Sequence, residues 1–480
     1  MDICMNSVEE LINIVKTKKI TSSELQQYYL NRLNVLDEKV KAFIHHQNDL
    51  QSSRSETFLR GIPFAIKDNI MALGTQTTAA SKMLWNYRST YDATVVEYLK
   101  KNGAVLFGKT NMDEFSMGST TEHSAFFPTK NPWDMQRVPG GSSGGSAVAV
   151  AAGMVPFALG SDTGGSIRLP ASYCGVVGLK PTYGLVSRYG LIAFSSSMDQ
   201  IGPITRSVRD AALIMNVISG KCRYDSTQVN RQKDYLKDIE EPMDGLHMAC
   251  IKETFEIDCD NHIQKRFEEA LRQLGWMGVK VDYLSLKQFH AAYPVYSIIS
   301  TAEASSNLAR YDGLLYGLRV TTEQKGEVLH KTREMGFGTE VKRRLLLGTF
   351  NLSHQRYEDY YQRAIDLRMF ISQQLTEIFK SYDAIISPVS KRTPGNIGET
   401  CDIRDMCQYD TNTVLANLAG LPAISVPMGF VGTTPVGLQF MADKFNDNQL
   451  LRIARAYEKA AGFYEDGCYP APHIEGIENV

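Results

Sequence analysis

The stretch PGGSSGGSAVAVAAGMVPFALGSDTGGSIRLPASYCGVVGLK, residues 139–180, decides how this chain folds. It contains two clusters of glycine with serine, at 140–145 and 162–166, separated by small apolar residues. Glycine allows positive φ and close backbone approach to a ligand, so such clusters are typical of loops that direct N–H groups at an anion. Between them we expect a helix over 146–153 and a buried strand over 155–159. Two flexible linkers are the alternative, but linkers do not enclose a continuous apolar segment.

A third element lies upstream, where GIPFAIKDN occupies residues 61–69 and its apolar part predicts a short buried strand ending at Lys67. Together, the three elements resemble the amidase signature family, whose glycine- and serine-rich signature would cover residues 129–220. The two serines of the family pattern match Ser142 and Ser166 at the family's separation. The resemblance implies a catalytic triad of Lys67, Ser142 and Ser166.

The chemistry of such a triad requires a neutral lysine. A serine hydroxyl is a poor nucleophile until a base takes its proton, and none of the nine histidines lies in a recognisable nucleophile-elbow pattern. The resemblance implies that Ser166 attacks an amide carbonyl while Ser142 bridges it to Lys67, the ultimate base. Burial without a carboxylate partner would lower the pKa of Lys67. Asp68 is adjacent, but we expect it on the opposite face of an extended segment.

The resemblance also implies how the loops around the serines act. Ser142 would follow a non-proline cis peptide bond, and its neighbour Ser143 would have a structural role. Backbone N–H groups would form an oxyanion hole, supplied by Thr163, Gly164, Gly165 and Ser166. Phosphate binding is the other use of glycine-rich loops, but neither GxxxxGK[ST] nor GxGxxG follows a strand here.

Composition sets limits on the class of protein. Hydrophobic residues at 43% and charged residues at 22% are ordinary for a globular protein. The net charge of −2 gives no global attraction to nucleic acid or anionic membrane, so another chain would hold any RNA. Eight cysteines without CxxC or Cys/His spacing indicate reduced thiols. With no leader and no long apolar run, we expect a cytoplasmic protein.

Alternating helices and short apolar strands predict an α/β fold, a single large domain with a central twisted mixed β-sheet covered by helices. Ser7 and Ser22 are candidate caps for two N-terminal helices. We expect a β-α-β unit at 247–284 and a largely helical segment at 302–377, broken near 334–338. Strands at 384–387 and 424–427 and a final helix at 449–462 follow. In the 1–480 domain we expect N-terminal helices at about 5–40, the signature core at 60–220, an insertion at 245–380 and a return to the core at 381–465.

Other stretches are similar to one branch of the family, the A subunits of aspartyl/glutamyl-tRNA amidotransferases. They occur at 111–119, 129–134, 184–203, 302–313, 341–344 and 417–422. This branch implies that an arginine holds the α-carboxylate of glutamine and an aspartate its α-amine, with a tyrosine nearby. The matching positions are Arg344, Asp410 and Tyr296. Arg343 competes for the arginine role, Asp410 could belong to a surface ion pair, and Tyr296 could be a core residue.

The branch implies a glutaminase half-reaction through a γ-glutamyl ester on Ser166. Ammonia would pass to a B subunit that holds the aminoacyl-tRNA and uses ATP and Mg²⁺, and a C subunit would clamp the two chains. This chain itself would hold no cofactor and no metal. A stand-alone amidase for small aliphatic or aryl amides is the alternative, and a non-catalytic assembly protein is a third class. The sequence departs from the usual family residues at His123, Phe127, Leu169, Leu185 and 387–392. None of these changes removes a catalytic group, but a paralogue with a different amide substrate or partner surface would show such departures.

Overall fold

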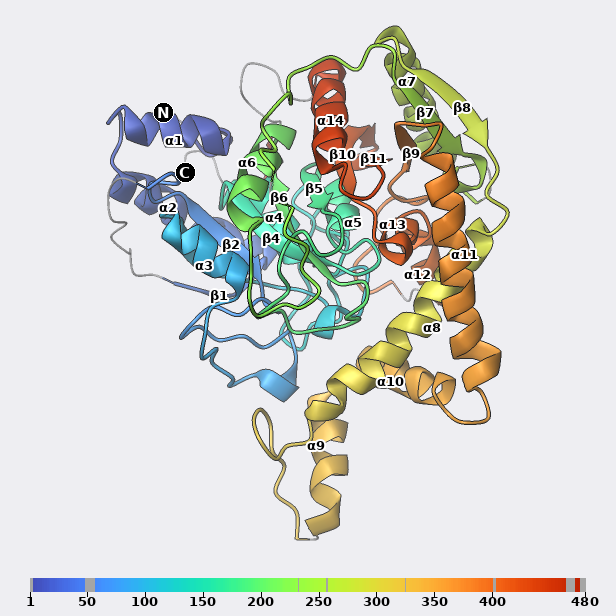
Figure 1. The fold of residues 1–480 in the computed structure, drawn as a ribbon. Helices are drawn as coiled ribbons and strands as arrows, with labels where there is room; N and C mark the ends of the chain where they lie inside the picture. Colours follow the sequence, from blue (N-terminus) through green and yellow to red (C-terminus); the bar gives the residue numbers. More distant parts are fainter. Residues whose placement is uncertain are drawn as a thin grey trace.

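A continuous mixed β-sheet of eleven strands runs through the part of the chain that the computed structural model describes (Figure 1). That part comprises residues 3–47, 57–231, 233–255, 258–323, 325–399, 403–462 and 471–474. In order across the sheet, the strands are β1 (Phe43–His46), β3 (Val105–Thr110), β2 (Pro63–Lys67), β4 (Phe157–Asp162), β6 (Gln200–Thr205), β5 (Val177–Lys180), β10 (Ala423–Val431), β11 (Thr434–Met441), β9 (Ala384–Pro388), β7 (His247–Ile251) and β8 (Lys280–Leu284). The predicted single α/β domain with a mixed sheet is therefore confirmed.

Strand direction explains where the site forms. Strand β2 is parallel to both of its neighbours, β3 and β4, with Ile66 opposite Leu159. Because parallel strands end at the same edge of a sheet, Lys67 at the end of β2 and the glycine-rich loop after β4 are brought together. The predicted β-α-β unit is also present, since β7 and β8 are parallel and joined by helix α7 (Asn261–Trp276).

Helices cover the sheet, and their ends carry the expected signals. The N-terminal pair is α1 (Val8–Lys16) and α2 (Ser22–Val40), each begun by a reciprocal capping box. Ser7 caps α1 as predicted, whereas Thr21, and not Ser22, caps α2. The remaining α-helices are α3 (Thr94–Lys101), α4 (Gly144–Ala151), α5 (Arg168–Cys174), α6 (Val208–Ile218), α7 (Asn261–Trp276), α8 (Phe289–Asn307), α9 (Val328–Gly336), α10 (Thr339–Asn351), α11 (Arg363–Ile378), α12 (Ile403–Asp410), α13 (Val414–Ala419) and α14 (Asp447–Ala461).

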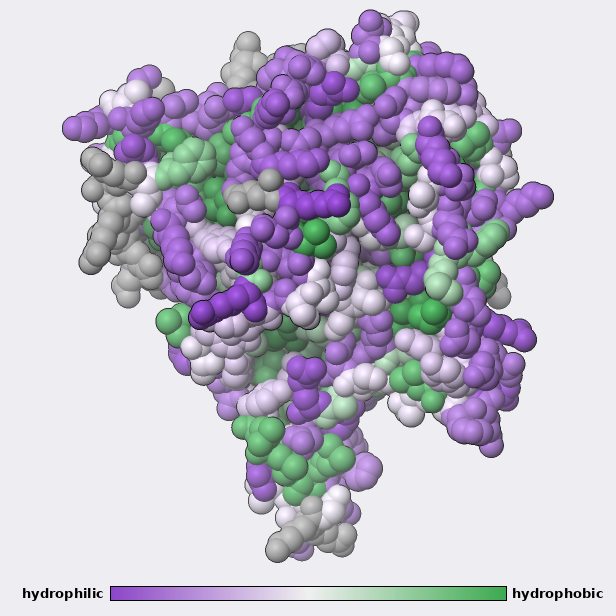
Figure 2. Space-filling model, viewed as in Figure 1, coloured by the Kyte–Doolittle hydropathy of each residue, from purple (hydrophilic) through white to green (hydrophobic). Residues whose placement is uncertain are grey.

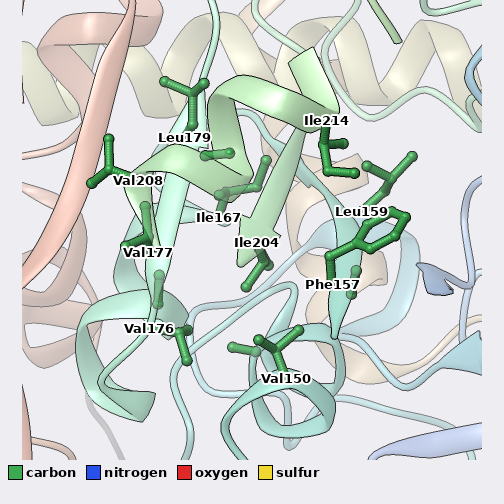
Figure 3. Packing of buried hydrophobic residues seen from close by; sticks show 14 of the residues in the cluster. Val150, Phe157, Leu159, Ile167, Val176, Val177, Leu179, Ile204, Val208 and Ile214 are labelled. Atoms are coloured by element: carbon green, nitrogen blue, oxygen red, sulfur yellow. The ribbon is translucent and has the colours of Figure 1, made fainter. Parts of the chain in front are cut away.

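The core lies directly behind the two glycine-rich loops. Figure 3 shows side chains from α4, β4, β5, β6 and α6 converging on one apolar space, with Val150 and Phe157 among them. Ile167 belongs to the same cluster and is fully buried. Because Ile167 follows Ser166 directly, its packing holds the loop at 163–166 against the sheet. We call this loop the nucleophile loop, because Ser166 is the predicted nucleophile.

Several elements differ from the sequence-based expectation. Helix α8 begins at Phe289 and contains Pro294, well before the expected start at 302, and residues 311–323 form no long helix. Strand β11 was not predicted, because all eight of its residues are buried and no alternation marks it. The break at 337–338 between α9 and α10 is where the glycines predicted it. The expected end of the returning segment at 465 lies outside the described residues.

The helices of the insertion at 245–380 lie at one end of the sheet and include a projection from the body of the molecule (Figure 1). Helices α8, α10 and α11 lie together below the β7–β9 end of the sheet, and α9 projects from the body (Figure 1). Figure 2 shows a largely hydrophilic surface with an apolar patch on this projection, where Leu314, Leu315 and Leu329 are exposed. No helix of the described segments is long and apolar enough to cross a bilayer.

Candidate active site

Lys67 is fully buried at the end of β2 and lies against Ser142. Its Nζ donates to Ser142 Oγ at 2.6 Å and contacts the carbonyl oxygen of Ser161 at 3.3 Å. Burial lowers the pKa of Lys67 to about 7, against the opposing charges of three aspartates. These are Asp113, Asp162 and Asp199. A lysine with this pKa has a large neutral fraction near pH 7, as a general base requires.

Asp68 does not pair with Lys67. Its carboxylate forms a buried ion pair with Lys109 at 3.0 Å and accepts the backbone N–H of Thr78 at 2.9 Å. Lys109 also donates to Thr77 Oγ1 at 2.8 Å. The two adjacent residues therefore face different partners, as the extended geometry of β2 predicts.

The first serine loop brings Ser142 and Ser143 to the centre of the site. The Gly141–Ser142 peptide bond is cis, as the resemblance implies. Ser143 donates its backbone N–H to the carbonyl oxygen of Ser166 at 3.1 Å and its hydroxyl to the carbonyl oxygen of Ser161 at 3.1 Å. Ser143 thus ties the two serine loops together, and only Ser142 contacts Lys67.

Ser166 lies between β4 and α5 with 8% of its surface exposed, so it faces an opening while most of it is buried. Within the described residues its hydroxyl has no hydrogen-bond partner, and the expected bond to Ser142 is not formed. The N–H groups of Thr163, Gly164 and Ser166 are likewise without partners in this part of the chain. Gly165 instead donates its N–H to the Asp162 carboxylate at 2.9 Å, so its assignment as an oxyanion donor is not supported.

A buried ion pair that the sequence did not reveal fixes this loop. The Asp162 carboxylate accepts the N–H groups of Gly165 and Ile167 and two hydrogen bonds from the Arg168 guanidinium, at 3.0 and 2.9 Å. Asn417 donates to it as well, at 2.9 Å. Burial raises the pKa of Asp162, but the Arg168 charge outweighs this effect and holds the pKa well below its usual range. The adjacent GSDTGGSIR motif was the available signal.

Arg344 is buried on α10, and Arg343 beside it is half-exposed. Both guanidinium groups bond the Glu340 carboxylate, Arg344 through Nε at 2.7 Å. Burial lowers the pKa of Arg344, but Glu340 and two tyrosines outweigh it and the pKa is raised, so Arg344 stays charged. Its guanidinium also lies 5.6 Å from the ring centre of Phe194. Burial favours Arg344 over Arg343 as a substrate-facing cation.

Asp410 ends α12 and is 9% exposed, so it is not part of a surface ion pair. Its carboxylate accepts a hydrogen bond from Ser119 Oγ. Burial raises the pKa of Asp410 to about 7, while the Ser119 hydrogen bond and the positive charge of Arg344 act in the opposite direction. The Thr413 hydroxyl contacts the carbonyl oxygens of both Asp410 and Gly164, and thereby joins this residue to the nucleophile loop.

Tyr296 on α8 packs against the nucleophile loop. A β-carbon built on Gly164 would lie 2.5 Å from Tyr296 Cζ and 2.7 Å from its hydroxyl oxygen. Burial raises the pKa of the Tyr296 phenol; the positive charge of Arg344 lowers this pKa, and the negative charge of Asp410 raises it further. The charges of Arg344 and Asp410 both act on Tyr296, and Tyr296 contacts Gly164, so the three residues implied for substrate binding lie on the side of the loop where Gly164 is; Tyr296 is also packed as a core residue.

The residues that depart from the family pattern have structural contacts here. Leu169 packs in a buried cluster with Tyr173 and Tyr409, next to Asp410. His123 donates its N–H to the Asp113 carboxylate, and the Phe127 ring lies 5.9 Å from Lys41 Nζ. In the 387–392 segment, the Ser390 hydroxyl and the Arg392 carbonyl oxygen bond the Tyr173 hydroxyl. Leu185 is buried.

The described residues contain no group of three His, Cys, Asp or Glu side chains arranged to hold a metal ion.

Comparison with known proteins identifies the family. The family model described as Amidase matches residues 22–451. The chain belongs to the amidase signature family. The A subunit of the glutamyl-tRNA(Gln) amidotransferase of Thermotoga maritima is 51% identical to this amidase over 469 residues, 98% of each chain. The crystal structure of a Thermotoga maritima protein of that name superimposes with a TM-score of 0.87 at 48% identity, covering 99% of each chain.

A more distant relative shows how widely the amidase fold is shared. The peptide amidase of Stenotrophomonas maltophilia covers 99% of both chains with a TM-score of 0.82, but it is only 28% identical. The fold alone therefore does not separate these enzymes, and the choice between them depends on sequence identity and on the residues around Ser166.

Proposed function

We propose that this chain is the glutaminase subunit of a tRNA-dependent amidotransferase. The observation that carries the proposal is a pair of buried groups of opposite charge, Arg344 and Asp410, which both act on Tyr296 next to Gly164. A free amino acid presents one carboxylate and one ammonium group, and charge-assisted hydrogen bonds to both would select it over a neutral amide. Identity of 48–51% to proteins named as the A subunit of glutamyl-tRNA(Gln) amidotransferase supports the same conclusion.

Glutamine would bind with its α-carboxylate on Arg344, its α-ammonium group on Asp410 and its side-chain amide against Ser166. Tyr296 would close the space over the nucleophile loop, because it contacts Gly164. The amide oxygen would receive hydrogen bonds from the N–H groups of Thr163 and Gly164. Loss of one such donor commonly costs about 3 kcal/mol of transition-state stabilisation.

The reaction would begin when neutral Lys67 accepts the Ser142 proton while Ser142 accepts the proton of Ser166. Ser166 Oγ then attacks the side-chain carbonyl carbon, and its negative charge passes to the carbonyl oxygen. When the tetrahedral intermediate collapses, the C–N bond breaks and the proton returns through Ser142 to the departing nitrogen, which leaves as ammonia. Water attacks the resulting γ-glutamyl ester by the same proton relay, frees glutamate and restores the Ser166 hydroxyl.

The proposal includes the partners of this chain. Ammonia would pass to a B subunit, which would hold the aminoacyl-tRNA and use ATP and Mg²⁺ to activate its Glu or Asp. A C subunit would clamp the two chains into a heterotrimer. The net charge of −2 of this chain is consistent with another protein of the assembly binding most of the tRNA.

Ammonia release by the full-length chain tests the proposal. The substrates are glutamine, glutaramate (which lacks only the α-amine), 4-aminobutanamide (which lacks only the α-carboxylate) and a simple aryl amide, with Ser166→Ala as the blank. We expect a preference for glutamine that increases when the B and C subunits are added. Vigorous hydrolysis of aryl or aliphatic amides without preference for glutamine would instead identify a stand-alone amidase.

A further inference from the structure

The loop at 113–119 contacts Ser142, Asp410 and the start of α10, although none of its residues belongs to the triad or is assigned to binding. Asp113 donates its N–H to the Ser142 carbonyl oxygen at 3.3 Å, and Ser119 donates its hydroxyl to Asp410. Ser116 Oγ accepts a hydrogen bond from Asn69, which also donates to Ser161 Oγ. The same loop therefore supports both the bridging serine and the residue proposed to hold the α-amine.

Glu114 connects this loop to the helix that carries Arg344. Its Oε2 accepts the backbone N–H of Gly338 at 2.8 Å, and Gly338 is the N-cap residue of α10. Helix α10 has no side-chain cap of its own, so a carboxylate from a residue far away in the sequence takes that place. A negative group at a helix N-terminus is favoured by the helix dipole as well. Glu114 as a whole residue is only 4% exposed.

Further contacts lock the same junction. Ser81 donates its hydroxyl to Glu114 and contacts the Gly336 carbonyl oxygen, at the end of α9. The rings of Phe115 and Phe337 meet edge to face with centres 5.7 Å apart. Phe115, with φ of 49°, occupies the left-handed region that side chains other than glycine rarely adopt. Strain of this kind persists where the surroundings determine the conformation, and it is common at functional sites.

Helix α10 has few other constraints at this end. It packs along α8, where Gly348 is held so close that an added β-carbon would clash with the Thr301 carbonyl oxygen (Figure 1). That contact fixes the far end of α10, beyond Arg344. Near its start, Val341 and Leu345 share an apolar cluster with Phe115. Such apolar contacts are not directional, so they hold the helix close to the loop without fixing its position along the contact. The hydrogen bond from Gly338 to Glu114 is thus the directional contact between the first turn of α10 and the loop.

We propose that Glu114 is a positioning residue for glutamine specificity, which sets the distance between the carboxylate-binding Arg344 and the amine-binding Asp410. Glu114 fixes the start of the Arg344 helix, and Ser119, on the same loop, fixes the Asp410 carboxylate. A zwitterion can bind both charges only if their spacing matches the substrate. This inference rests on the proposed glutaminase function and adds a determinant of substrate choice to it.

The test compares Glu114→Ala with Glu114→Gln in the full-length chain, with and without its partner subunits. Alanine removes the acceptor for Gly338, so we expect the KM for glutamine and for glutaramate to rise about tenfold or more. The kcat/KM for 4-aminobutanamide, which never uses Arg344, should change by less than about twofold. Glutamine at position 114 keeps an oxygen acceptor of the same shape and should restore most of the affinity.

Glu334→Ala is the matched control, because Glu334 is exposed on α9 close to the same junction and its side chain pairs with Lys331 on the surface. It should leave the KM and kcat/KM for all of these substrates unchanged. An equal loss on 4-aminobutanamide and glutamine in Glu114→Ala, or no change in either, would overturn the inference. If the wild-type chain itself does not prefer glutamine to 4-aminobutanamide, the proposed function fails first. Melting curves separate either result from unfolding.

Discussion

Gly164 and Tyr296 are in direct contact, and there is no room for a β-carbon between them. The added atom would lie 2.5 Å from Tyr296 Cζ, well inside van der Waals distance. Gly164 belongs to the loop that carries the nucleophile, and Tyr296 belongs to the insertion helix α8. This contact joins the signature core to the insertion.

Gly164→Ala should therefore lower amide hydrolysis by about tenfold or more while the fold persists, since the loop or the tyrosine must move. Tyr296→Ala in the same chain removes the clash, so a double-mutant cycle should show a coupling of about 1 kcal/mol or more. Gly275→Ala in α7 is the control, because a β-carbon there meets no atom within 4 Å. Strictly additive effects in the cycle would show that the contact has no functional part.

The pH dependence of kcat/KM tests the base. The pKa of Lys67 is lowered to about 7, and only the neutral amine accepts a proton, so activity should rise with pH through about 7 and then level off. The pKa of Asp410 is raised to about 7, and only its charged form attracts the α-ammonium group. Below about pH 7, the kcat/KM for glutamine should therefore fall as the inverse square of the proton concentration, because both Lys67 and Asp410 become protonated. The kcat/KM for glutaramate should fall as its inverse first power, because only Lys67 matters there. A rate on glutaramate that stays constant down to about pH 5 would contradict the assignment of Lys67.

Arg344→Ala should raise the KM for glutamine by about tenfold to a hundredfold, the usual value of a charged hydrogen bond. The same change should hardly affect 4-aminobutanamide. Arg343→Ala is the matched control, because Arg343 bonds the same Glu340 carboxylate but is half-exposed. If the two variants behave alike, or if both substrates lose equally, Arg344 does not bind the carboxylate.

Arg168→Leu should destabilise the protein, because it leaves the Asp162 carboxylate buried without its cation. Breaking a buried pair on one side commonly lowers the free energy of unfolding by about 3–5 kcal/mol. Lys101→Ala, which breaks an exposed pair with Glu97, should lower it by less than about 1 kcal/mol. Urea unfolding measures both changes, and an equally small effect in the two variants would show that the Asp162–Arg168 pair does not hold the nucleophile loop.

Much of the fold was predictable where an element has one exposed face or a glycine boundary. Helices α1, α2, α6 and α14 show clear amphipathic spacing, and the β7-α7-β8 unit shows an ordinary strand–helix–strand pattern. Strand β11 and helix α13 are buried on all sides and were missed, because uniform apolar composition carries no period. Helix α4 and strand β4 are equally buried, but the glycine clusters on either side of them made them predictable.

Motifs predicted which side chains to compare at the site. Lys67 and Ser142 are in contact as predicted, whereas the expected bond between Ser142 and Ser166 is not formed in the described residues. The catalytic role of the triad and the choice of Arg344 over Arg343 stay predictions. The hydrogen bond from the Gly165 N–H to Asp162 and the Asp162–Arg168 pair were missed, although all three residues lie within GSDTGGSIR, residues 160–168. The Glu114 link to α10 joins residues far apart in the sequence, and no spacing along the chain records it.

The central claim is that Ser166 forms a γ-glutamyl ester with glutamine. The most direct measurement is mass spectrometry of the full-length chain quenched with acid during turnover, followed by digestion and sequencing of the modified peptide. A glutamyl adduct on Ser166, absent from Ser166→Ala and cleared when glutamine is exhausted, is the predicted result. Ammonia release from glutamine in wild type and Ser166→Ala alike, with no adduct on Ser166, would contradict the account.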